Sequence, residues 1–243
     1  MDLANFNSSI RSAIGFFEER GIWQATVYNS ALPRSTQFNK LALSTKNYIE
    51  IYETGLALSQ YNFLLNDLSF FQFSHTSGTE FALAYYPNPR LSGSPKALDE
   101  YLEYEKERDD GVLSDEEFAE LASLMPVAYF VPRIRFEYSE RQYKNVRHPA
   151  AHLHIGMSGE DRWPSARKLS PLTFSMLMTK HYYPEKWWLA SRFSQPVNEQ
   201  HLHHETCLDR RLVEALQSDG ISQSLSNDEK MSFHFAALVG GSN

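Results

Sequence analysis

Hydrophobic residues at the start of the chain follow a helical spacing. Between Asn5 and Arg20 they recur every three or four positions, at Phe6, Ile10, Ala13, Ile14 and Phe17. This spacing predicts an amphipathic helix that ends at Gly21. The same pattern predicts a second helix from Leu43 to Ser59, with Ser44 as its N-cap.

The spacing then changes to every second residue. Aromatic and aliphatic side chains alternate through residues 61–65 and 71–73, and a further run covers 80–86. Asn66-Asp67 and Thr76-Ser77-Gly78 separate these runs, so the segment predicts an antiparallel meander. Residues 97–124 predict one or two helices interrupted at Asp110-Gly111, with Ser114 and Glu117 forming a capping box.

The second half of the chain alternates between strand and helix patterns. Strands are expected at 127–138 and 149–156, and a last strand at 231–235. Helices are expected from Ser170-Pro171 to His181 and from Leu208 to Gln217. The sequence contains no repeat and no flexible linker, so we predict a single α+β domain over residues 1–243, an antiparallel sheet flanked by helices. Its parts are a helical N-terminus (1–59), strands (60–86), an acidic helical insert (97–124), the histidine strand region (127–156) and a helical C-terminal part (169–243).

Composition limits the class of protein. The chain has 243 residues, 42% of them hydrophobic and 22% charged, which is typical of a globular domain. The single cysteine, Cys207, cannot form an internal disulfide, and this favours a reducing compartment. The first residues show no signal-peptide pattern, and no apolar run approaches the roughly 20 residues of a membrane span. We therefore expect a soluble cytoplasmic protein with no membrane partner.

The net charge of −7 hides an uneven distribution. Residues 99–120 contain 11 acidic and two basic side chains, whereas residues 133–211 contain 13 basic and eight acidic ones. The acidic run is typical of a solvated helix face. Because the second half of the chain is basic, the negative net charge does not exclude a polyanionic ligand.

The histidine strand region carries the main candidate chemistry. Alternate residues of a strand share one face, so Ile134, Phe136 and Tyr138 are expected to point one way and Arg133, Arg135 and Glu137 the other. In the next predicted strand, Leu153 and Ile155 leave His152 and His154 on the opposite face. If the strands pair with their apolar faces toward the core, the other face collects arginines, a glutamate and histidines, in a cleft open to water.

This combination of residues suits phosphodiester cleavage. Histidines can exchange protons near neutral pH, and arginine donors match phosphate oxygens. RNA needs no metal for such a reaction because its 2′-hydroxyl can act as the nucleophile. We assign acid–base catalysis to His152 and His154, with His148 and Glu137 in support. Substrate binding is assigned to Arg133, Arg135, Arg147 and Tyr138, with Tyr143 as an alternative aromatic.

Other interpretations of these residues remain open. The group can be structural, with cross-strand ion pairs on a surface. His148, His152 and His154, or Glu137 in place of His148, can hold zinc or manganese, whereas the leading hypothesis needs no cofactor. The pattern His152-Leu153-His154 also occurs in nucleases that use a tyrosine, here Tyr182 or Tyr183.

Several further features are weaker candidates. The segment His201-Leu202-His203-His204-Glu205 can supply a ligand or an acid, and is more typical of a solvated loop. Trp187 and Trp188 can stack on bases, and are more typical of a core or an oligomer contact. Cys207 is a poor candidate nucleophile. No phosphate loop, dinucleotide fingerprint, nucleophile elbow or CxxC pair occurs.

The chain also resembles a known family. Tyr61-Asn62-Phe63, Phe71-Gln72-Phe73, Arg135-Phe136-Glu137-Tyr138 and the run from His148-Pro149 to Gly156 resemble an uncharacterised bacterial domain-of-unknown-function family, DUF2290. About 25 residues around the histidine strand are similar to small bacterial toxins that are paired with antitoxins. The resemblance implies a role in bacterial conflict or phage defence.

These observations together favour one functional hypothesis over two others. The leading hypothesis is a nucleic-acid phosphodiesterase, a ribonuclease that acts as a toxin or effector, with RNA preferred to DNA and a cognate antitoxin or defence protein as partner. The first alternative is a non-enzymatic, antitoxin-like partner that uses residues 99–120. The second is a metal-dependent hydrolase of a small phosphorylated substrate.

Overall fold

The protein is built on one antiparallel sheet. The computed structural model describes residues 1–33, 35–44, 47–92, 94–127, 133–157, 162–192, 207–221 and 225–232. Seven strands lie in the order of the chain, each antiparallel to the next: β1 (Trp23–Thr26), β2 (Phe63–Leu65), β3 (Phe70–Ser77), β4 (Glu80–Tyr86), β5 (Ile134–Ser139), β6 (Ala151–Ile155) and β7 (Trp163–Pro164). The predicted α+β class and antiparallel meander are confirmed.

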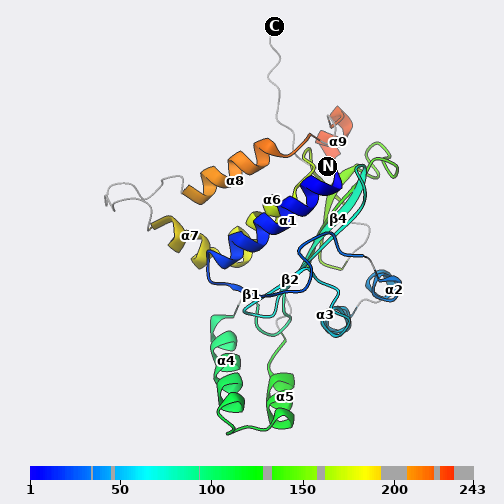
Figure 1. Cartoon of the computed structure of the whole chain (residues 1–243). Helices are drawn as coiled ribbons and strands as arrows, with labels where there is room; N and C mark the ends of the chain where they lie inside the picture. Colours follow the sequence, from blue (N-terminus) through cyan, green and yellow to red (C-terminus); the bar gives the residue numbers. More distant parts are fainter. Residues whose placement is uncertain are drawn as a thin grey trace.

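Three helices cover one face of this sheet (Figure 1). They are α1 (Leu3–Glu18), α6 (Pro171–Tyr182) and α8 (Cys207–Ser218), and α7 (Pro184–Arg192) follows α6. The predicted apolar stripe of α1 is buried against the aromatic side chains of β2, β3 and β4. Trp187 also belongs to this core, whereas Trp188 is half exposed. Burial of these rings supplies most of the driving force for folding.

A smaller apolar cluster lies on the other face, beneath α2 (Thr36–Ser44) and α3 (Tyr48–Ala57). Phe70 lies in its centre, stacked on Tyr86 and Tyr52 with ring centroids 4.7 and 5.6 Å apart. The prediction that Ser44 caps the second helix was wrong. Ser44 ends α2, and Asn47 stands at the N-cap position of α3.

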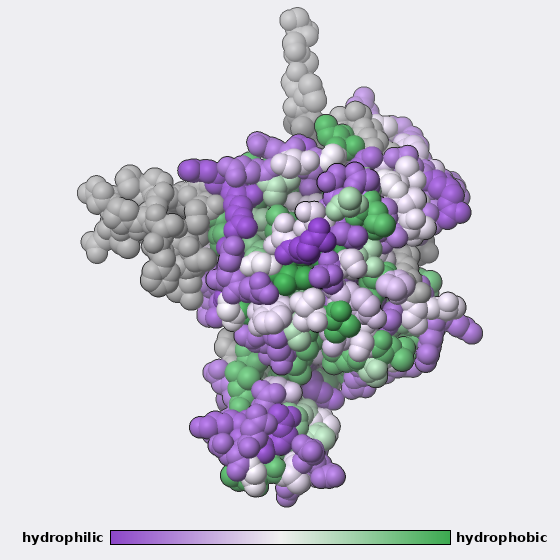
Figure 2. All heavy atoms as spheres, in the orientation of Figure 1, coloured by the Kyte–Doolittle hydropathy of each residue, from purple (hydrophilic) through white to green (hydrophobic). Residues whose placement is uncertain are grey.

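The acidic insert forms a helical arm. Helices α4 (Pro95–Asp109) and α5 (Asp115–Leu124) pack on each other and project away from the sheet (Figure 1). The predicted break and the capping box of Ser114 and Glu117 are confirmed. Polar side chains dominate the surface of this projecting hairpin at the bottom of Figure 2. The arm places its charges away from the histidine strand region.

The sequence analysis did not predict several short strands and helices. Strands β1 and β7, with four and two residues, and helix α2 were not predicted. The strand expected at 231–235 was wrong at its start, because Met231 lies in α9 (Asn227–Ser232); its remaining residues lie outside the described part. Among the described residues, no helix has the length and apolar character required to cross a membrane.

Candidate metal centre

The pairing of β5 with β6 determines which side chains meet. Arg135 lies opposite His154, and Glu137 opposite His152, in the antiparallel register. Cross-strand partners project from the same face of a sheet, so these four side chains share a face. Phe136 and Leu153 pair between them and point toward the core on the other face. The predicted alternation of the two strands is therefore present.

Two imidazoles and one carboxylate converge on this face. His152 Nε2 and His154 Nε2 lie 3.0 Å apart, and Glu137 Oε2 lies 3.9 Å from His154 Nε2. The potential ligand atoms of Glu137, His152 and His154 all lie within 4.8 Å of one another. Zinc–nitrogen bonds are about 2.0–2.1 Å long, so two ligands of one ion lie at most about 4.2 Å apart, and binding of one ion by all three side chains needs only a small movement of the partly exposed Glu137.

The backbone fixes the protonation of His152. Its Nδ1 lies 2.8 Å from the carbonyl oxygen of Pro149. A carbonyl oxygen only accepts hydrogen bonds, so Nδ1 carries the proton and Nε2 presents its lone pair to His154 and Glu137. A hydrogen bond from the ring nitrogen that does not bind the metal is typical of metal-binding histidines, because it orients the ring and sets its tautomer.

Burial keeps both imidazoles neutral. His152 is fully buried and His154 is 3% exposed, whereas the side chain of Glu137 is one-third exposed. Desolvation lowers the pKa of both histidines to about 4; Glu137 opposes this shift, while Arg135 adds to it at His154. The expectation that His152 and His154 line a cleft open to water was wrong, because Glu137 is the one of the three ligands that reaches solvent. Neutral imidazole is the form that binds a metal.

Cationic and aromatic groups surround the three ligands. The ring of His148 lies edge-to-face against that of His152, with centroids 4.8 Å apart. Arg135 Nη1 lies 3.3 Å from Glu137 Oε1. Arg162, which directly precedes β7, lowers the pKa of His148, His152 and His154 after the larger effect of burial. Sequence reasoning missed Arg162, because β7 is too short to show an alternating pattern.

Unsatisfied polar atoms are concentrated on this face. Among the described residues, most of the buried side-chain nitrogen and oxygen atoms that lack a hydrogen-bond partner lie around this cluster, including Arg133 Nη1, Arg135 Nε, Ser139 Oγ, His148 Nδ1 and His154 Nδ1. Native proteins leave few such atoms, and a group of them indicates a place where an ion, water or ligand binds.

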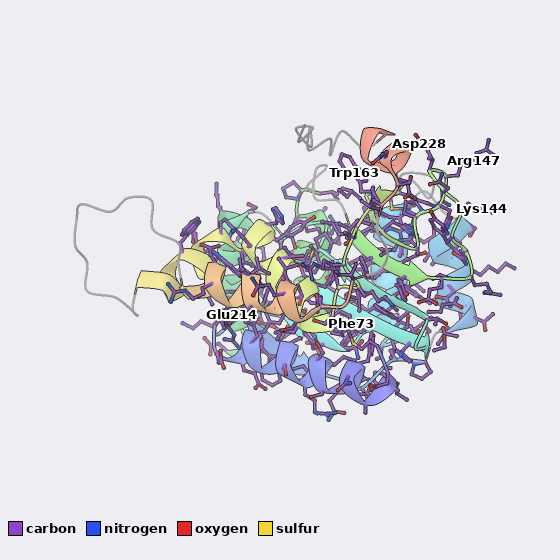
Figure 3. All side chains as sticks on the ribbon, turned by 90° about the horizontal axis from the view of Figure 1, so that it is seen from above. Phe73, Lys144, Arg147, Trp163, Glu214 and Asp228 are labelled. Atoms are coloured by element: carbon purple, nitrogen blue, oxygen red, sulfur yellow. The ribbon has the colours of Figure 1, made fainter. Side chains whose placement is uncertain are left out.

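Other predicted site residues lie elsewhere. Tyr138 is buried on the core face, where it donates to Glu140 and lies under the ammonium group of Lys168, so it does not join the histidine cluster. Tyr143 and Arg147 are exposed in the β5–β6 connection. In Figure 3, Lys144 and Arg147 lie at the outer end of the molecule that also holds Trp163.

The tyrosines proposed as nucleophiles also lie on the core side. The Tyr183 hydroxyl donates to Asp67 Oδ2 at 2.9 Å and lies 2.8 Å from the Tyr85 hydroxyl. The ring of Tyr182 packs on Tyr85. Both are therefore separated from His152 and His154 by the sheet. The candidates His201–Glu205 lie outside the described residues.

The fold and the cluster define an α+β protein with a candidate His₂Glu metal centre on one face of its sheet. The chain belongs to the family described as "Uncharacterized conserved protein (DUF2290)", whose model matches residues 24–237. This confirms the resemblance stated for the aromatic and histidine motifs. No curated protein and no solved structure matches the chain significantly.

Proposed function

We propose that this protein is a divalent-metal-dependent phosphodiesterase that acts on nucleic acid, with the metal held by Glu137, His152 and His154. The observation that carries the proposal is the convergence of these three ligand atoms within 4.8 Å, on a face where Pro149 orients one imidazole. Two nitrogen ligands and one oxygen ligand suit zinc or manganese, and also ferrous iron. Three protein ligands leave positions for water and substrate.

The buried environment favours a metal over metal-free acid–base catalysis. A general acid and base work best when their pKa values lie near the working pH. His152 and His154, with pKa values of about 4, remain neutral near pH 7 and offer no proton to a leaving group. A bound divalent ion lowers the pKa of its water and polarises a phosphoryl oxygen, which supplies the chemistry that neutral imidazoles lack.

The charges of this face favour an anionic substrate. Arg135 pairs with Glu137, Arg135 and Arg162 both lower the pKa of His154, and a divalent ion would add further positive charge. Guanidinium groups bind phosphate oxygens through paired N–H donors. The exposed basic connection that contains Lys144 and Arg147 extends the positive charge toward a polymeric ligand. A role as toxin or effector in bacterial conflict, with RNA as substrate and an antitoxin as partner, rests on the resemblance of the histidine strand.

Elemental analysis and a cleavage assay test this proposal together. We expect about one equivalent of zinc, manganese or iron in the purified protein, and metal-dependent cleavage of total RNA or of single-stranded DNA. Glu137→Gln removes one ligand and should reduce both metal content and cleavage about tenfold or more. Glu80→Gln is a matched control, because Glu80 is a partly exposed carboxylate on the same sheet outside the three ligands.

The outcomes separate the hypotheses. Cleavage that is unaffected by chelator and by Glu137→Gln would refute the metal-dependent mechanism. Stoichiometric metal without cleavage of either nucleic acid would favour a hydrolase of small phosphorylated substrates. Absence of both metal and cleavage would favour the non-enzymatic partner that uses the acidic arm.

A further inference from the structure

We propose that Glu229 is a positioning residue of the metal centre: from α9 it holds the β5–β6 connection (residues 140–150) in a strained turn, and this turn places the groups that orient His152. The inference rests on the proposed function only for the metal itself. The contacts between α9 and the connection involve none of the three metal ligands, so they can be tested on the metal-free protein.

The connection contains a residue in a backbone conformation that its side chain disfavours. Val146 has a φ angle of 65°, in the left-handed region. Glycine adopts this region easily, whereas a β-branched side chain such as that of valine is strongly disfavoured there. A residue in such a conformation persists only where surrounding contacts hold it, and residues of this kind are concentrated at functional sites. The contacts around Val146 therefore indicate which groups maintain the turn.

Helix α9 supplies such contacts from a distant part of the chain. The backbone N–H of Val146 donates to Glu229 Oε1 at 3.4 Å, and the Ser226 hydroxyl donates to Asn145 Oδ1 at 2.9 Å. Glu229 has no exposed surface, so its hydrogen bonds are shielded from water. Figure 3 shows α9, marked by Asp228, beside the connection. Two hydrogen bonds therefore connect this helix to the strained turn.

The carboxylate of Glu229 has two separate roles. Its Oε2 accepts the backbone N–H of Ser226 at 2.8 Å, and the N–H of Glu229 donates to Ser226 Oγ at 3.1 Å. This pair is a capping box that stabilises the start of α9. The other oxygen, Oε1, accepts from Val146 and is not needed for the box. Glutamine has a single acceptor oxygen, so at this position it can serve one of the two N–H groups but not both.

The turn fixes the groups that contact His152. Lys144 and His148 exchange two backbone hydrogen bonds across the turn, of 2.9 and 2.8 Å. The ring of His148 lies edge-to-face against that of His152, and the carbonyl oxygen of the next residue, Pro149, accepts from His152 Nδ1. A change in the turn would therefore move both groups. Loss of outer contacts of this kind commonly lowers metal affinity about 10–100-fold.

Hydrogen exchange of the chelator-treated protein tests the contact between α9 and the turn without metal. Glu229→Gln should raise the exchange of the amides of residues 144–148 about tenfold, because a hydrogen bond to a charged group is lost. Helix α9 should stay protected, because the glutamine oxygen remains for the shorter bond to Ser226. Asn145→Ala removes the other contact with α9 and should act in the same direction. Asp228→Asn, at an exposed carboxylate of the same helix, is a matched control and should change neither.

Two further measurements separate positioning from a purely structural role. Val146→Gly in the Glu229→Gln background should restore the protection, because glycine adopts the left-handed turn without strain. Gln142→Gly, in the same connection but outside the left-handed region, should not restore it. The affinity for zinc, measured by competition with a coloured chelator, should fall about tenfold in Glu229→Gln and recover when Val146→Gly is added.

The outcomes distinguish this inference from the proposed function. Unchanged exchange of residues 144–148 in Glu229→Gln would overturn the inference, and so would a loss of protection that is confined to α9. Failure of Val146→Gly to restore the protection, or faster exchange with unchanged zinc affinity, would also overturn it. If the wild type binds no zinc, the proposed function fails, and the exchange experiment alone decides whether Glu229 holds the turn.

Discussion

Acid should destabilise the metal-free protein through its two buried histidines. In the unfolded chain these imidazoles titrate near 6.5, but in the folded protein burial lowers their pKa to about 4. Between these values the unfolded chain binds more protons than the folded protein. Stability is therefore fully present above about pH 6.5 and is lost as the pH falls toward 4.

The expected loss follows from the size of the pKa shift. From about pH 7 to about pH 5, one histidine with these pKa values contributes a loss of about 2 kcal/mol in the free energy of unfolding, and the coupled pair at most about twice that. The charged groups around the pair oppose one another: Glu137 raises the pKa values, while Arg135, Arg162 and His148 lower them. Desolvation is the largest contribution for both rings, so the direction of the effect is set by burial.

Urea unfolding in the presence of chelator measures this loss at the two pH values. The double variant His152→Gln/His154→Gln should lose most of the pH dependence, whereas His75→Gln, which replaces a histidine outside the cluster on β3, should retain it. The same decrease in the wild type and in the double variant would show that other groups cause it. The buried neutral pair would then be an incorrect description of the site.

Two further predictions concern the scaffold. Gly55→Ala should destabilise the protein by about 1–2 kcal/mol in urea unfolding, because a Cβ atom at this position would lie 2.6 Å from Phe70 Cζ, in a ring that is held on both sides. Gly15→Ala on α1 meets no atom within 4 Å and should stabilise by up to about 1 kcal/mol; the reverse order would contradict the packing. Ser114→Ala removes the N-cap of α5 and should cost about 1 kcal/mol of local stability. Hydrogen exchange should show this loss within the arm, and unchanged protection of α5 would argue against the cap.

The elements that the sequence predicted well are those with strong local signals. The apolar stripe of α1, the alternation in β3 and β4, and the Ser-Pro start of α6 each determine their structure from neighbouring residues. Strand β7 has two residues and depends on pairing with β6. Helix α2 has a polar sequence and is held by packing on Phe70 and Tyr86, which lie far away along the chain. Such long-range contacts leave no local pattern.

The same limit applies to the site. Alternation along β5 and β6 predicted that Arg135, Glu137, His152 and His154 share a face, because a strand period is local information. The burial of His152 and His154 depends on residues from other parts of the chain that pack over that face. The sequence around the two histidines has no local pattern that predicts this packing. The position of Tyr138, in contrast, followed from the local alternation. The alternation along the strand predicted that Tyr138 lies on the core face, where the structure has it. It was also assigned to substrate binding only because a phenol can bind a phosphate or a base.

The arm has a consequence for how this fold can vary. The chain leaves β4 at Tyr86 and enters β5 at Ile134, which lies opposite Tyr85 in the register. The intervening residues are thus an excursion from a single β-hairpin, and the strands on either side remain neighbours whatever its length. Because loop-closure entropy grows only slowly with length, shortening, extending or exchanging α4 and α5 should have little effect on the sheet that carries the histidines. The arm is the natural place for this architecture to acquire a new specificity.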